Sequence, residues 1–215
     1  MDQSLSRRRF LTSVSMLAAG TMMTVPSFVF SDPAKKLKIL LVGTGIRGTS
    51  FWGKRLVDQY SDILEFVGLC DINPGRLEYA KEYMGVECPT SENFVDLVNR
   101  PKPDLVIVTT KDSTHHEYII KGLDMGCDVL TEKPLTTDER KCQAILDAER
   151  RNNRNLIVGF NYRWSPYMTK VKELLAEEAI GKVTSVDFHW YLNTYHGASY
   201  FRRWHGQREY GGTLW

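Results

Sequence analysis

Three glycines in a short turn are the residues whose spacing most clearly indicates chemistry. Gly43, Gly45 and Gly48 form the pattern G-x-G-x-x-G directly after the apolar run Leu37–Val42. In a strand–turn–helix unit, such glycines permit a tight turn, close approach of a pyrophosphate and close packing of the helix on the strand. The N–H groups at the helix start also favour phosphate binding. We therefore predict a dinucleotide-binding turn whose contact residues are Gly43, Thr44, Gly45, Ile46, Arg47 and Gly48.

An acidic residue completes this pattern. Asp71 directly follows the apolar run Leu64–Cys70. We expect its carboxylate to accept hydrogen bonds from the adenosine ribose and to repel a 2′-phosphate, which favours NAD over NADP. Arg76 lies five residues further on, so it is a further candidate for cofactor binding, and NADP remains an alternative cofactor. A glycine turn in an unrelated α/β protein is the alternative interpretation of the motif.

The surrounding elements must position these residues. Short apolar runs, typical of strands buried on both faces of a parallel sheet, occupy Leu37–Val42, Leu64–Cys70, Asp104–Thr110, Asp128–Thr131 and Leu156–Phe160. The segments between them carry helix signals, with Asn73 as a predicted N-cap and Gly85 as a terminator. Two capping boxes are also predicted, Thr114 with Glu117 and Thr136 with Glu139. The predicted fold class is α/β, with a doubly wound parallel Rossmann sheet in residues 32–160.

Residues 161–215 are expected to begin a second domain of the α+β class. Ser165 and Pro166 predict the start of a helix with Met168, Val171, Leu174 and Leu175 facing inward. Val183–Leu192 alternates loosely, like one strand of an open sheet. One helix and one or two strands do not bury a sheet face by themselves. We therefore interpret residues 161–215 as an incomplete substrate and oligomerisation domain of a longer protein.

Residues 1–31 are predicted to be a targeting segment rather than part of the fold. Ser6–Leu11 contains Arg7, Arg8 and Arg9 and matches the twin-arginine export pattern, and an uncharged stretch follows it. This predicts an exported protein, periplasmic or in the cell envelope, with the twin-arginine export machinery as a partner. A membrane anchor is the alternative, because the stretch is long enough to span a bilayer and no clear cleavage site is present.

The composition excludes several classes of function. The net charge of +2 comes entirely from Arg7, Arg8 and Arg9 against Asp2, so we expect no nucleic-acid surface. The four cysteines have no C-x-x-C spacing and are expected to be small buried side chains. His115 and His116 are adjacent and do not face one another on a helix, so no metal site is predicted.

A second motif brings in a known family. Thr131-Glu132-Lys133-Pro134, the glycine turn, Asp71 and His115 together resemble the Gfo/Idh/MocA family (glucose–fructose oxidoreductase, inositol dehydrogenase). His115 stands 17 residues before Glu132, as in the family's H…EKP spacing. The stretch Phe160–Arg163 is also similar to the family's passage into its substrate domain.

This resemblance implies a tightly held NAD(H), a sugar or polyol substrate and a homo-oligomer. Lys133 looks like the family lysine that hydrogen-bonds the reacting hydroxyl or carbonyl, and it follows a buried strand, at the edge where doubly wound sheets place ligands. It is the predicted catalytic residue. The resemblance implies that Glu132 and the Lys-Pro bond, often cis in the family, shape the loop beside the nicotinamide. Thr110 and His115 are the remaining candidates at the cofactor edge.

Two features depart from the family pattern. Thr110-Lys111-Asp112 stands where members usually have a proline after the fourth strand. The family's catalytic histidine, normally downstream of the Gly-Gly pair, is not within residues 1–215. We therefore expect these residues alone not to complete the reaction.

Three functions remain open. The first is an NAD-dependent oxidoreductase that acts on a carbohydrate. The second is a glycoside hydrolase that uses the same cofactor transiently for oxidation and elimination. The third is a non-catalytic NAD- or sugar-binding protein. The candidate substrate contacts lie in aromatic and basic segments that could instead be exposed loops or subunit contacts, and they are Arg163, Trp164, Tyr195 and His196.

Overall fold

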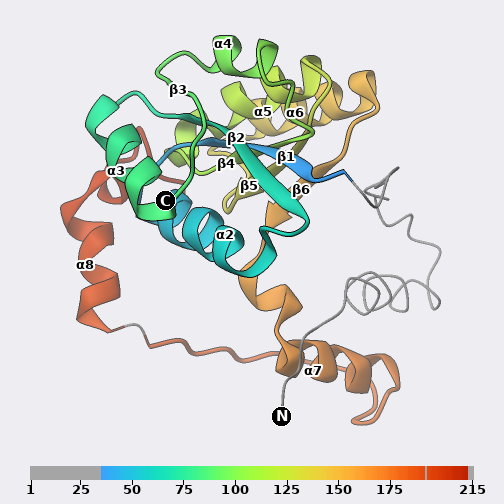
Figure 1. Cartoon of the computed structure of the whole chain (residues 1–215). Coiled ribbons are helices and arrows are strands. Elements are labelled where there is room, and N and C mark those ends of the chain that lie inside the picture. The colour runs from blue at the N-terminus through green and yellow to red at the C-terminus, as the bar shows by residue number, and fades with distance from the viewer. Residues whose placement is uncertain (1–34, 192, 213–215) are drawn as a thin grey trace, which may run out of the picture. The chain divides into compact units, whose positions relative to one another are not determined.

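The computed structural model describes residues 35–191 and 193–212 (Figure 1). The chain divides into the compact units Met1–Pro33 and Ala34–Trp215, and only the second contains described residues. The predictions for the targeting segment 1–31 and for Leu192 therefore lie outside the described residues. Among the residues that are described, no helix has the length and apolar character needed to cross a membrane.

A six-stranded parallel sheet lies at the centre of the fold, in the strand order β3-β2-β1-β4-β5-β6. Its strands are β1 Leu37–Val42, β2 Leu64–Cys70, β3 Thr90–Ser91, β4 Leu105–Val108, β5 Asp128–Glu132 and β6 Leu156–Gly159. All five predicted strands are confirmed to within two residues at each end, and the short β3 was not predicted. The strand order changes direction between β1 and β4, which is where sheets of this kind bind ligands.

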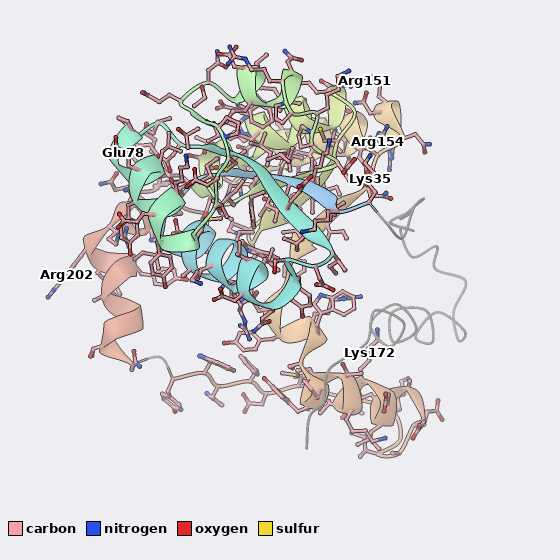
Figure 2. All side chains as sticks on the ribbon, in the orientation of Figure 1. Lys35, Glu78, Arg151, Arg154, Lys172 and Arg202 are labelled. Atoms are coloured by element: carbon pink, nitrogen blue, oxygen red, sulfur yellow. The ribbon has the colours of Figure 1, made fainter. Side chains whose placement is uncertain are left out.

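Helices cover both faces of this sheet, which confirms the doubly wound α/β class (Figure 1). One face carries α4 (Phe94–Asn99), α5 (His115–Asp124) and α6 (Glu139–Asn152), and the other carries α2 (Arg55–Tyr60) and α3 (Pro74–Met84). The shared core includes side chains of the central strands and of α5 and α6, namely Leu40, Val42, Val106, Val108, Val129, Ile119, Leu123, Ile145 and Ala148. Charged side chains such as Glu78, Arg151 and Lys172 point outward (Figure 2).

The helix caps agree with the sequence in α3 only. The Asn73 side chain accepts a hydrogen bond from the Arg76 N–H, and Gly85 ends the helix with φ +69°. Neither capping box forms. Thr114 lies in the short helix η2 (Asp112–Thr114), and its hydroxyl contacts Lys111 O instead of the helix N–H groups. In α6 the charged Asp138 carboxylate, two residues after Thr136, accepts the N–H of Lys141 and takes the cap position.

The region after β6 differs from its prediction. It contains η3 (Asn161–Trp164), α7 (Pro166–Ala176), α8 (Thr194–Arg202) and η4 (Trp204–Gly206). The helix begins at Pro166 as predicted, but Val171, Leu174 and Leu175 are 40–48% exposed instead of buried. The predicted strand is wrong over Val183–Tyr191, where the described chain forms no strand and no sheet ladder. A strand needs a hydrogen-bonded neighbour, and none of the described residues provides one there.

Candidate cofactor and catalytic site

The first and third glycines of the turn are required by close contacts. Gly43 has φ +90°, and a Cβ there would lie 2.7 Å from the carbonyl of Thr109. A Cβ on Gly48 would lie 2.1 Å from Gly43 O. The Thr109 hydroxyl also donates to the carbonyl of Gly43, which ties the turn to the end of β4. These glycines therefore allow β1, the helix that follows the turn and the β4 loop to approach one another.

Gly45 plays a different role. A Cβ at this position would meet nothing within 4 Å, so the middle of the turn faces open space. An unobstructed backbone at the carboxyl end of β1, just before a helix, is what a pyrophosphate requires. The residues present therefore fit a dinucleotide, and Gly45 is the position where one can approach most closely.

Asp71 holds the turn from the neighbouring strand. Its Oδ2 accepts hydrogen bonds from the backbone N–H and the hydroxyl of Thr44, at 2.7 and 3.2 Å. Its Oδ1 accepts the N–H of Asn73 at 2.9 Å. Asp71 is buried, whereas Arg76 on α3 is exposed. The carboxylate thus fixes the shape of the turn, a role that the sequence did not reveal, and its contact with a ribose stays a prediction.

The Glu132–Pro134 loop forms the second half of the site, at the carboxyl end of β5. Lys133 is exposed, and the Lys133–Pro134 bond is cis. Glu132 is buried, and its Oε1 accepts hydrogen bonds from Arg47 Nε and Trp52 Nε1, both at 2.6 Å. Trp52 carries no motif signal and was missed from the sequence.

His115 connects this loop to the loop after β4. The residue is 1% exposed, with Nδ1 2.9 Å from Pro134 O and Nε2 3.2 Å from Thr110 O. A neutral imidazole carries one N–H, so it donates to one of these carbonyls at a time. His115 and Thr110 therefore lie together beside the Glu132–Pro134 loop, at the edge of the sheet where they were expected.

Residues 210–212, which include the Gly-Gly pair and are termed the returning segment, return to the same edge of the sheet. Gly212 N–H donates to the buried carboxylate of Asp112 at 3.0 Å, and Ser113 N–H donates to Tyr210 O at 3.1 Å. The Lys111 ammonium lies 3.9 Å from the centroid of the Tyr210 ring. Lys111 and Asp112, the residues that we interpret as a departure from the family pattern, thus contact the returning segment. The unusual residues Lys111 and Asp112 could be recognised in the sequence, but their contacts with Tyr210 and Gly212 could not.

The candidate substrate residues are less defined. Arg163 and Trp164 lie exposed on η3, with the guanidinium carbon 5.6 Å from the centroid of the Trp164 ring. Tyr195 and His196 belong to α8, but their side chains lie outside the described residues. These four assignments stay predictions. Within residues 35–191 and 193–212, no group of three or more His, Cys, Asp or Glu side chains could hold a metal ion.

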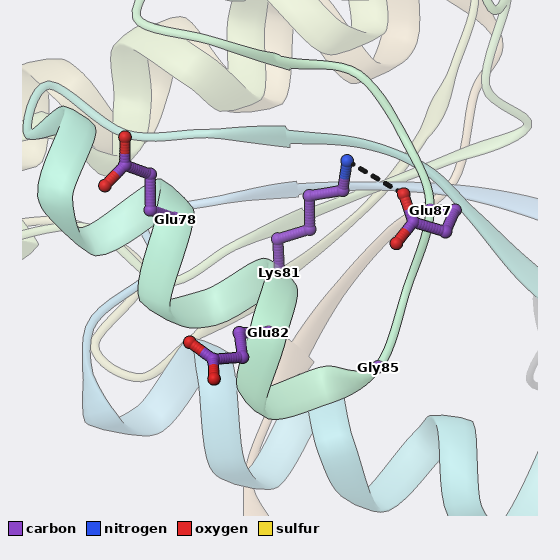
Figure 3. Close-up of a pocket in the computed structure, with 5 residues that line it drawn as sticks. All are labelled: Glu78, Lys81, Glu82, Gly85 and Glu87. Atoms are coloured by element: carbon purple, nitrogen blue, oxygen red, sulfur yellow. Dashed lines mark ion pairs between the residues drawn. The ribbon is translucent and has the colours of Figure 1, made fainter.

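A surface hollow at the C-terminal end of α3 is a separate feature (Figure 3). It is lined by Glu78, Lys81, Glu82, Gly85 and Glu87, and Lys81 pairs with Glu87 at 3.0 Å. Asp71 precedes the other end of α3, and eleven helical residues span about 16 Å. The hollow is therefore distant from the glycine turn, and its excess of carboxylates does not suit a phosphate.

Strand order, glycine turn and acidic residue together define a Rossmann-type dinucleotide-binding protein. Comparison with protein families agrees: residues 37–160 match the Gfo/Idh/MocA model, described as an oxidoreductase family with an NAD-binding Rossmann fold. The chain belongs to this family.

Several relatives are informative. YteT of Bacillus subtilis (strain 168) is 40% identical over 180 residues, which cover 82% of this chain and 42% of the relative. An inositol 2-dehydrogenase/D-chiro-inositol 3-dehydrogenase of Lactiplantibacillus plantarum is 30% identical over 73% of this chain and 45% of its own length. The crystal structure of scyllo-inositol dehydrogenase from Lactobacillus casei, with NAD(H) and scyllo-inositol, matches with a TM-score of 0.63 and 25% identity, over 70% of this chain and 44% of that one. The chain thus spans less than half of the length of these relatives.

Proposed function

We propose that the protein is an NAD-dependent dehydrogenase that oxidises a polyol, sugar or sugar derivative. The observation that carries this proposal is the placement of Lys133 at the carboxyl end of β5, in a loop held by Glu132 and His115. The glycine turn lies at the same edge of the sheet, after β1. The names of the inositol dehydrogenase relatives support a polyhydroxylated substrate.

The residues divide the work between binding and proton transfer. The turn at Gly45 binds the pyrophosphate, and Asp71 faces the ribose and selects NAD. The bound cofactor supplies the hydride acceptor for a carbinol carbon. Lys133 hydrogen-bonds the reacting hydroxyl and, together with a histidine of the whole protein outside residues 1–215, takes its proton.

Substitution of Lys133 tests this function. Because general acid–base catalysis contributes about 10²–10⁴-fold, Lys133→Met should lower turnover by that amount and leave NADH affinity nearly unchanged. The assay follows NADH formation by the whole protein with inositols and aldoses, since the match to this chain covers only 42% and 45% of the two relatives. Lys121→Met, an exposed change on α5, is the matched control.

Two outcomes would contradict the proposal. Full turnover by Lys133→Met would remove the lysine from the reaction. Release of an aryl alcohol from an aryl glycoside, without net NADH, would favour the hydrolase alternative. We also propose that residues 1–215 alone bind the cofactor without completing the reaction, and a single-turnover assay of that segment tests this.

We further propose that the protein is exported through the twin-arginine route. The support is the Ser6–Leu11 sequence with its paired arginines. A reporter fused after residue 34 should reach the periplasm in a strain with the export machinery, and the double change Arg7→Lys, Arg8→Lys should block it. Export of both forms through the general secretory route would contradict this.

Self-association is proposed for the whole protein as well. The support is the set of large apolar side chains that are about half exposed or more after β6, including Phe160, Trp164, Phe188, Trp190 and Tyr191. Light scattering should give a mass that is a multiple of the monomer mass, and a monomer at all concentrations would contradict the proposal.

A further inference from the structure

We propose that Arg47 and Trp52 are positioning residues for Lys133, because they hold the Glu132–Pro134 loop against the helix that follows the glycine turn. The inference rests on the proposed function, since it concerns the same site. It assigns to the Arg47 side chain a role other than contact with the cofactor phosphates, and it gives a role to Trp52, which belongs to no motif.

The contacts converge on one atom. Glu132 Oε1 accepts hydrogen bonds from Arg47 Nε and from Trp52 Nε1, both at 2.6 Å. The Glu132 side chain is 10% exposed, and a carboxylate withdrawn from water in this way needs such donors. The bond from Arg47 is charge-assisted, which makes it shorter and stronger than a neutral hydrogen bond. Arg47 Nη2 also donates to Asn161 Oδ1 at 2.6 Å, so one guanidinium links the ends of β5 and β6.

The winding of the helix explains how both donors reach one oxygen. Arg47 and Trp52 are five residues apart on η1 (Arg47–Lys54), which is a π-helix with i→i+5 hydrogen bonds. In an α-helix five residues turn through about 500°, so the two side chains would point roughly 140° apart. The wider π turn reduces this angle. Such segments are rare and frequently occur at functional sites.

Packing fixes the two side chains in place. The Arg47 guanidinium lies 3.8 Å from the centroid of the Phe51 ring, and Phe51 packs edge-to-face on Trp52 at 5.1 Å. At the end of β6, a Cβ on Gly159 would lie 3.1 Å from Trp52 Cζ2, so the absence of a side chain at Gly159 leaves space for the indole. Gly159 is also the ladder partner of Glu132 across β5 and β6. Donors locked by packing in this way can hold a reacting group in a narrow range of positions.

These hydrogen bonds connect the helix after the glycine turn to the Glu132–Pro134 loop. Gly48 and Arg47 belong to the start of η1, while Glu132 directly precedes Lys133. The turn that receives the dinucleotide and the lysine that meets the substrate are therefore joined through two side-chain hydrogen bonds. A misplacement of about 1 Å can cost on the order of 10²-fold in rate, so this link matters for turnover more than for binding.

Three substitutions weaken the link, two at its donors and one at its acceptor. Arg47→Met and Trp52→Phe delete the donors but keep much of the side-chain bulk, and Glu132→Gln removes the charge of the acceptor. Arg55→Met is the matched control, because the Arg55 guanidinium also lies near the Phe51 ring, 5.4 Å from its centroid, but makes no described hydrogen bond to Glu132. Amide hydrogen exchange of the peptide that contains residues 130–137 is measured without cofactor, alongside NADH affinity, kcat and KM.

The proposal expects faster exchange of this peptide in the three variants, a fall in kcat of about 10–100-fold, and changes in KM and NADH affinity of about threefold or less. Trp52→Phe combined with Glu132→Gln should lose little more than the worse single variant, since both break one link. The proposal would be overturned if the three variants had the same kcat and the same amide exchange of residues 130–137 as Arg55→Met. It would also be overturned if they had a lower melting temperature with unchanged kcat. If the wild type neither binds NADH nor turns over, the proposed function fails, and the exchange data alone still decide whether the loop is held by Arg47 and Trp52.

Discussion

The two halves of the site are built in different ways. The half at β1 and β2 is made of backbone: an open glycine turn held by one buried carboxylate, all within residues 43–73. The half at β4 and β5 is made of side chains from distant parts of the chain. Glu132 meets Arg47 across 85 residues, and Asp112 meets Gly212 across 100. In the first half Gly43 and Gly48 have no room for a Cβ and Gly45 leaves space for a ligand, whereas the second half depends on contacts that single substitutions remove.

This difference predicts opposite sensitivities. In the glycine turn a single methyl group should be damaging, and in the side-chain half the removal of one polar atom should be enough. Three predictions test this contrast in order of decreasing effect, and a fourth concerns a property that both halves share.

The largest expected effect is that of a methyl group in the turn. Gly45→Ala places a Cβ in open space, so the fold should keep its melting temperature while NADH affinity falls about tenfold or more. Gly48→Ala instead forces a backbone clash and should also destabilise the fold, by about 1–3 kcal/mol. Calorimetric titration and thermal unfolding of both variants distinguish the two. Unchanged NADH binding by Gly45→Ala would show that no ligand approaches the turn.

The next effect concerns the choice of cofactor. Asp71→Asn keeps an acceptor for Thr44 N–H but removes the charge that faces a 2′-phosphate. We expect the ratio of NADPH to NADH affinity to rise about tenfold, which corresponds to about 1.4 kcal/mol. Asp71→Ala, which leaves the buried N–H of Thr44 without this partner, should in addition lower stability by about 1–3 kcal/mol. An unchanged ratio of NADPH to NADH affinity in Asp71→Asn would show that the 2′ position of the adenosine ribose does not lie beside Asp71.

A smaller effect is expected at the returning segment. Asp112→Ala removes the acceptor of Gly212 N–H, so residues 208–212 should detach more often. Trypsin should then cleave after Arg208 several-fold faster, at a rate set by this local opening. Asp124→Ala, at the other end of α5 and paired with Arg151, is the control and should not change that cleavage. Equal cleavage of both variants would show that Asp112 does not hold the segment.

The smallest effect is a pH dependence that both halves share. Burial raises the pKa of Cys70 to about 12, and the nearby Asp71 charge adds to this. Burial likewise raises the pKa of Cys127, beside β5, from the ordinary value of 9.0 to about 11. The unfolded chain therefore loses these protons first, so stability should fall as the pH rises above about 9. Urea unfolding between about pH 8 and pH 10 measures how steeply the free energy of unfolding falls with pH, and Cys70→Ala should make this fall less steep. A free energy of unfolding that does not change with pH would contradict the raised pKa of the two buried thiols.

The fold could be predicted largely because its signals are local. Continuous apolar runs marked β1, β2, β4, β5 and β6, and the Asn73–Pro74 and Gly85 pair marked both ends of α3. The capping boxes failed because a nearby group, Asp138 in one case and the η2 turn in the other, competed for the same backbone. Val183–Tyr191 failed as a strand because its apparent alternation has no pairing partner in the described chain.

The site was predictable to the extent that it depends on backbone. Gly43, Gly45 and Gly48 are recognisable from spacing, because Gly43 and Gly48 permit close contacts within the turn and Gly45 leaves the backbone open to a ligand. Trp52 was not recognisable, because its role depends on a π turn and on the gap at Gly159. The partner of Asp112 was also hidden, because only the folded chain brings Gly212 to it.

The most direct test of the whole account is a calorimetric titration of NADH into the folded protein, with Gly45→Ala beside it. The account predicts binding at one site in the wild type and a loss of about tenfold or more in the folded variant. A folded wild type that takes up no NADH, or a variant that binds it equally well, would contradict the claim that the turn from Gly43 to Gly48 receives the dinucleotide.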